Sequence, residues 1–90
     1  MENCVVECRH DYAVRTNGGE VSISNCTFKM NYTGTDATSG VIILRGNVDS
    51  EATITGCSAT KASSAMNDIY CTTAWTVNGT ALAAGTSANF

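Results

Sequence analysis

The chain has 90 residues, a formal net charge of −3 and an isoelectric point near 4.7, with 43% apolar and 14% charged residues. This composition indicates one small folded domain, is too apolar and too weakly charged for a disordered chain, and lacks the basic excess of nucleic-acid-binding proteins. The longest apolar runs, residues 41–44 and 81–84, are too short to span a bilayer, and no basic segment followed by an apolar run predicts a signal peptide.

Short stretches of alternating polarity predict β-strands of two kinds. Residues 21–24, 52–55 and 75–78 alternate as in Val21-Ser22-Ile23-Ser24, which indicates strands with one buried face. Residues 12–16, 41–45 and 69–73 form a second kind of strand between them. Residues 30–40 are rich in Thr and Gly and predict an extended loop. Helical periodicity is weak throughout, so we expect an all-β protein.

These strands belong to an internal repeat. Residues 21–28 align with residues 52–59 at an offset of 31, which places Ile23 opposite Ile54. Residues 3–6 align with residues 25–28 at an offset of 22, and Val77 follows Ile54 by 23 residues, which places Gly79 opposite Gly56. We interpret these spacings as one repeat whose loop at residues 30–40 is lengthened once. Such repeats favour a stacked array, because each turn of short strands buries its inner face only against the next turn.

The repeated unit is Ile, then Asn or Gly, then Cys, with Phe or Ala two residues later, at residues 23–28 and 54–59. It resembles right-handed parallel β-helix proteins of the pectate-lyase-like superfamily. The resemblance implies a solenoid of about three to four rungs, with a tight corner at Asn3, Asn25, Gly56 and Gly79. In this family the corner often carries an asparagine ladder, which Asn3 and Asn25 keep. A small antiparallel β-sandwich is the alternative fold, but it requires tight Asn-Gly turns, found here only at residues 17–18 and 78–79.

Three of the five cysteines share one position in the repeat. We interpret Cys4, Cys26 and Cys57, with Thr80 completing the column, as an internal stack of small apolar side chains. Disulfides between them are disfavoured because the Cβ vectors of stacked residues run parallel. The spacing does not fit a zinc site, so no metal or cofactor is predicted. His10 near Cys8 lacks further partners, so no catalytic residue is predicted.

The outer face of the second kind of strand holds the candidate ligand-binding residues. We expect Arg15 and Arg45 to stack there beside Tyr70, with Asp11 and Asp68 just before their strands. They are candidates for binding a carbohydrate. The plainer interpretation is that the arginines are solvated and the aspartates accept backbone N–H groups in turns. The two aspartates are expected to have one rung between them, which places them about 9–10 Å apart at strand spacing. This separation does not favour catalysis.

Two further expectations concern orientation. Tyr12 and Val14 are expected to point inward and Ala13 to point outward, by alternation around Arg15. Trp75 is expected to close one end of the core rather than to bind sugar.

The chain is interpreted as a single module, residues 1–90, whose tail at residues 80–90 folds over one end while the other end stays bare. We expect a non-enzymatic structural or surface module that stacks end to end or forms part of a longer fibre or adhesin. Its partners would be copies of itself or neighbouring rungs. The alternative is a fragment of a carbohydrate-active β-helix that binds or cleaves an acidic polysaccharide. The resemblance implies an extracellular, cell-surface or virion location, where five unpaired thiols are unusual.

Overall fold

The computed structural model describes residues 1–46 and 50–90, and this part of the chain is all-β, without a helix. The strands form three sheets. The first sheet holds β1 (Val5–Cys8), β4 (Thr27–Met30) and β7 (Ser58–Lys61). The second sheet holds β2 (Val14–Asn17), β5 (Gly40–Arg45), β8 (Asn67–Cys71) and β11 (Thr86–Ala88). The third sheet holds β3 (Glu20–Ser24), β6 (Glu51–Thr55), β9 (Trp75–Val77) and β10 (Thr80–Leu82). The predicted all-β class is therefore confirmed.

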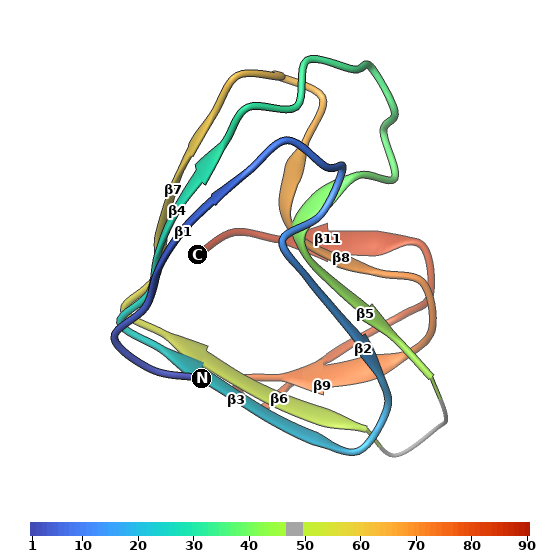
Figure 1. Cartoon of the computed structure of the whole chain (residues 1–90). Coiled ribbons are helices and arrows are strands. Elements are labelled where there is room, and N and C mark those ends of the chain that lie inside the picture. Colours follow the sequence, from blue (N-terminus) through green and yellow to red (C-terminus); the bar gives the residue numbers. More distant parts are fainter. Residues whose placement is uncertain (47–49) are drawn as a thin grey trace.

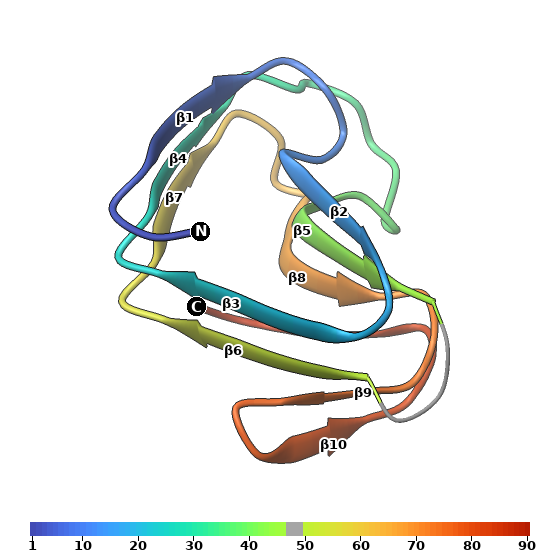
Figure 2. The same ribbon diagram turned by 60° about the horizontal axis from the view of Figure 1, so that its bottom comes forward.

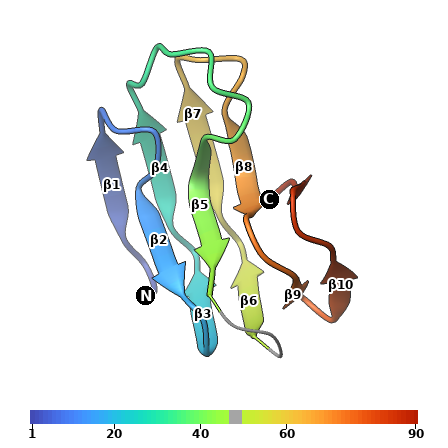
Figure 3. The ribbon, with the colours of Figure 1, turned by 90° about the vertical axis from the view of Figure 1, so that its right-hand side faces the viewer.

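The chain passes through the three sheets in the same order three times. We call each passage a circuit: β1–β2–β3, then β4–β5–β6, then β7–β8–β9. Strands of successive circuits are parallel neighbours in every sheet. Figure 1 shows the three sheets on three sides of the core, and Figure 3 shows the circuits side by side, with the N-terminus at one end and β10 at the other. These parallel pairs contradict the antiparallel sandwich.

The register of the first two circuits confirms the repeat. Ile23 of β3 lies opposite Ile54 of β6, and Val6 of β1 lies opposite Phe28 of β4. The loop at residues 31–39 lies where it was predicted, between β4 and β5. The first-sheet strands were not located from the sequence, although Phe28 and Met30 are buried and the residues between and before them are exposed. This alternation of apolar and polar residues could have predicted the first-sheet strands from the sequence.

The predicted tight corner precedes each strand of the first sheet. Asn3, Asn25 and Gly56 have φ values of 55°, 54° and 65°, in the left-handed region. Asn and Gly adopt this conformation more readily than other residues. A side chain on Gly56 would collide with Asn25 Oδ1, so the Asn25 side chain takes the space that an asparagine ladder would need.

The predicted fourth corner at Gly79 is wrong. Asn78 and Gly79, with φ values of 51° and 82°, form the two-residue turn of the β9–β10 hairpin, and β10 runs back antiparallel. Thr80 therefore does not join the cysteine column. The Asn78 side chain forms the hydrogen bonds to β6 that a longer β9 would form with its backbone. Ile54 N donates to Asn78 Oδ1 and Asn78 Nδ2 donates to Ile54 O, both at 2.8 Å. Val77 consequently lies opposite Ala52 instead of Ile54.

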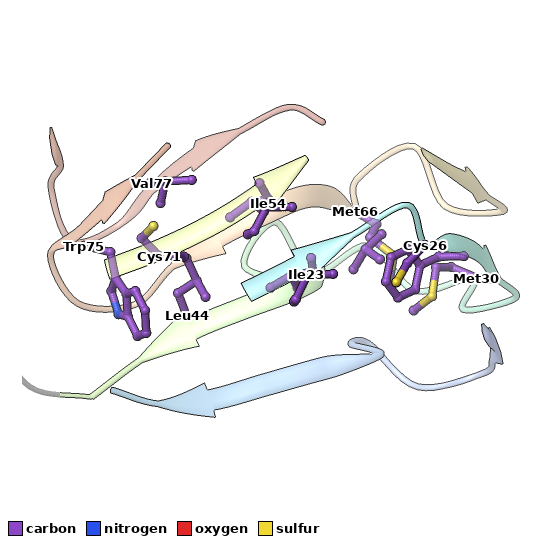
Figure 4. Close-up of a cluster of buried hydrophobic side chains, with 14 residues drawn as sticks. Ile23, Cys26, Met30, Leu44, Ile54, Met66, Cys71, Trp75 and Val77 are labelled. Carbon is purple, nitrogen blue, oxygen red and sulfur yellow. The ribbon is translucent and has the colours of Figure 1, made fainter. Parts of the chain in front are cut away.

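The core runs through the middle of all three circuits (Figure 4). Phe28 is fully buried and Trp75 is 2% exposed, which confirms the inward position predicted for Trp75. Four consecutive residues of β5, from Val41 to Leu44, are buried, so this strand is covered on both faces. Each circuit buries its apolar side chains against the next one, which explains how 90 residues with few aromatic groups form a core.

Candidate functional site

The two ends of the stacked circuits differ, and the end formed by the first circuit is open. β1 and β2 have a neighbouring strand on one side only within the described residues. The edge of β3 is partly covered, because Glu2 pairs with Ser24 in parallel and the Met1 ammonium donates to Ser22 O at 2.9 Å. We call the outer edges of β1, β2 and the start of β3 the open end. Figure 2 shows β1, β2 and β3 at this side of the molecule.

The open end offers unpaired backbone groups and half-buried apolar side chains. Cys4 O and Cys8 O accept hydrogen bonds from the second circuit at 2.9 and 2.7 Å. Because alternate residues of a parallel strand bond to opposite sides, the N–H and C=O groups of Val5 and Glu7 point away from β4. The side chain of Val6 is half-buried, whereas Phe28, its counterpart one circuit further, is fully buried.

The opposite end, which we call the closed end, is covered by the C-terminal segment. β10 lies antiparallel on β9, and β11 lies antiparallel on β8 (Figures 1 and 2). Phe90 stacks on Phe28, with ring centroids 6.0 Å apart. β7 is the exception, because no C-terminal strand lies beside it among the residues that the structure describes.

An ion pair lies at the closed end. Lys61 Nζ is 2.6 Å from Asp68 Oδ1, and the two side chains are 27% and 15% exposed. Asp68 Oδ2 accepts a hydrogen bond from Phe90 N at 3.0 Å. Asp68 therefore joins β7, β8 and the C-terminal segment. Asp11, the other aspartate among the candidate residues, lies ahead of β2, and its backbone carbonyl accepts a hydrogen bond from Gly40 N at 3.1 Å. Since β5 separates β2 from β8, the structure does not bring the two carboxylates together.

The predicted stack of Arg15 on Arg45 is wrong by two residues. Arg15 lies opposite Ile43, and Arg45 lies opposite Asn17. Arg45 Nε and Nη2 donate to Asn17 Oδ1 at 3.1 and 2.7 Å. Tyr70 also lies opposite Ile43, so Arg15, Ile43 and Tyr70 form one row across the second sheet.

A second correction concerns Tyr12. The chain bends at Ala13 and β2 begins at Val14, so the alternation does not extend back to Tyr12. Ala13, expected outside, packs against the core. Tyr12, expected inside, carries the Arg15 guanidinium 4.5 Å from its ring centroid and stacks on His10 at 6.3 Å. The His10–Tyr12–Arg15 stack was missed, because His10 and Tyr12 lie in the bent segment between β1 and β2, where alternation does not apply.

The cysteines repeat one local arrangement. The Sγ atoms of Cys4, Cys26 and Cys57 donate to the carbonyl oxygen two residues earlier, at 3.3, 3.3 and 3.5 Å. All five cysteines are free thiols. Cys26 and Cys71 are buried, and burial raises the pKa of the Cys71 thiol above its ordinary value.

Acidic side chains line the outer face of the third sheet. Glu20 and Glu51 lie opposite each other and border an open groove of about 350 Å³ with Val21, Ser22 and Thr53. In the loop at residues 31–39, hydrogen bonds from the Thr38 hydroxyl and backbone N–H lower the pKa of Asp36. Within residues 1–46 and 50–90, no group of three or more His, Cys, Asp or Glu side chains is placed to hold a metal ion.

No family model, curated protein or solved structure significantly matches this chain. Among the described residues there is no helix with the length and apolar character needed to cross a membrane.

Proposed function

We propose that this chain is a non-enzymatic structural module of the right-handed parallel β-helix type, whose open end receives further β-strands. The parallel pairing of three circuits and the repeated corner at Asn3, Asn25 and Gly56 support the β-helix assignment. The partners are copies of the chain or neighbouring rungs of a longer fibre or adhesin. The extracellular or surface location implied by the family resemblance belongs to the same proposal.

One observation carries the proposal: the edges of β1 and β2 are left unpaired while those of β8 and β9 are covered. An exposed row of N–H and C=O groups is a template for another strand. Natural sheets commonly protect such edges with proline or with inward-pointing charges, and Val5, beside the edge, is instead apolar and 83% exposed. The arrangement of Asp11 and Asp68 does not favour hydrolysis, since Asp68 is held by Lys61.

Sedimentation velocity over a concentration series, with reductant present, tests this proposal. The wild-type chain should give species that grow with concentration. Glu7→Pro removes an N–H group from the open edge and leaves the bonds of Cys4 and Cys8 to the second circuit in place, so it should stay monomeric. Glu7→Thr, which keeps the N–H group, should behave as wild type. The proposal is overturned if the wild-type chain and Phe90→Ala, which removes the stack on Phe28 at the closed end, are both monomeric at every concentration.

Binding of an acidic polysaccharide is a second candidate, favoured by the Arg15 guanidinium. It lies over the Tyr12 ring, and Arg15 is in one row with Tyr70. A planar cation beside aromatic surface is suited to a carboxylated sugar. Calorimetric titration with a polyuronate tests it. Arg15→Ala should abolish the heat of binding, whereas Arg45→Ala should not, because Arg45 is already engaged by Asn17. No heat with the wild-type chain would exclude this candidate.

A further inference from the structure

We infer that residues 80–90 are a displaceable cap over a second interface, and that this interface fits the open end of another copy. Copies would then join head to tail when the cap moves aside. The inference rests on the proposed function and adds to it the identity of the partner and a control on its binding.

The fit follows from the repeat. Inside the chain, the outer edges of β1 and β2 have the same position in the repeat as the edges of β4 and β5 that face the first circuit. The outer edge of β7, and the edge of β8 that β11 covers, have the same position as the edges of β4 and β5 that face the third circuit. Placing β1 and β2 of one copy on β7 and β8 of another therefore repeats a junction that the chain already forms twice.

The third sheet fits in the same way. β9 is short, and its Thr76 and Val77 pair with Glu51 and Ala52 at the start of β6. On β3 the equivalent residues are Glu20 and Val21. Met1 and Glu2 cover the other part of the β3 edge, near Ser22 and Ser24. β9 of a preceding copy would therefore cover the part of the β3 edge that is free. This β9 and residues 1–2 would together form one strand along the whole edge of β3.

The cap is held by a small set of contacts. Leu82, Ala88 and Phe90 pack against the core, while most of its other residues are exposed. The backbone bonds of β10 and β11 and the Phe90 N–H bond to Asp68 add to these contacts. β7 has no cap strand beside it, so β1 of an incoming copy can pair there first, before β11 leaves β8. An incoming copy offers parallel strands on all three sides, which favours exchange over the short antiparallel cap.

The test uses full-length variants at the cap. Phe90→Ala removes the stack on Phe28 and should lower the concentration at which assemblies appear by about tenfold, with Asn89→Ala as the exposed control. Electron microscopy should show linear head-to-tail assemblies, and adding Glu7→Pro to Phe90→Ala should return the chain to monomers. Circular dichroism checks the fold, and Ala88→Asp provides a second cap variant if Phe90→Ala does not fold.

The outcomes separate the two proposals. If wild type and both cap variants assemble at the same concentration, and Glu7→Pro still blocks assembly, the cap inference is overturned and the open end keeps its proposed role. If no variant assembles at any concentration, both the cap inference and the proposed function are overturned. Assembly that Glu7→Pro does not block would also overturn the inference, because it would not use the open end.

Discussion

The open and closed ends of this molecule are built from the same repeat but differ in burial. At the open end, Val14 of β2 points inward and remains half-buried. At the closed end, its counterpart Ile69 of β8 is buried, because β11 lies beside it. The side chains have similar character, so their burial is decided by the presence of the next layer. In a protein with few residues per layer, an uncovered layer leaves much of its apolar surface to be buried by a partner.

The largest expected effect compares one core residue from each end. Trp75→Ala removes a side chain that is 2% exposed at the closed end, and should lower the free energy of unfolding by about 3–5 kcal/mol. Val21→Ala removes a half-buried side chain of β3 at the open end, and should cost about 1 kcal/mol. Urea denaturation followed by circular dichroism measures both. Equal losses would mean that the ends are equally covered in solution.

The next largest effect is expected in the reactivity of the thiols at the two ends. Cys8 is half-buried at the open end, whereas Cys71 is fully buried and burial raises the pKa of its thiol. Because the thiolate is the reactive form and exposure of Cys71 requires local opening, alkylation of Cys71 at neutral pH should be at least about 100-fold slower than that of Cys8. Mass spectrometry of timed iodoacetamide reactions measures the two rates. Cys26 and Cys4, buried and half-buried at one position of the repeat, provide a matched pair.

The pH dependence of stability follows from the same shift. A thiol whose pKa is raised on folding stabilises the fold fully below its unfolded value, near 9.0, and this contribution is lost as pH rises through the folded value. The free energy of unfolding should therefore fall above about pH 9, and Cys71→Ser should reduce that fall.

For the alkylation experiment, similar rates at Cys71 and Cys8 would show that the C-terminal segment does not protect β8.

The sequence predicted the regular part of this fold better than its ends. The spacing of Ile23, Ile54 and the cysteine corners located the parallel register, because a buried position must recur wherever the next circuit lies on it. The hairpin at Asn78 and Gly79 was missed, since the same Gly suits both a β-helix corner and a tight antiparallel turn.

The candidate site was harder to predict, because it depends on registers and on local bends. The two arginines share a face, but a shift of two residues separates their side chains, and alternation alone cannot detect an even shift. The bend at Ala13 leaves Tyr12 half-buried and off the core, and periodicity does not predict such a bend. The role of Asp68 depends on Lys61 and Phe90, which a sequence repeat does not connect.

The ion pair at the closed end gives a smaller effect than Trp75→Ala, and it offers the most closely matched controls. Asp68→Asn leaves the Lys61 ammonium partly buried without its carboxylate and weakens the acceptor of Phe90 N, so it should cost about 1–3 kcal/mol. Asp11→Asn should change stability by less than about 0.5 kcal/mol, because the bond from Gly40 N to the Asp11 backbone carbonyl remains. Lys61 lies opposite Met30, so Lys61→Met in the Asp68→Asn background should recover most of the loss by replacing the unpaired charge with an apolar side chain. Thermal unfolding of the four proteins measures the comparison. If Lys61→Met recovers nothing, the loss in Asp68→Asn comes from the released C-terminal segment and not from the charge on Lys61.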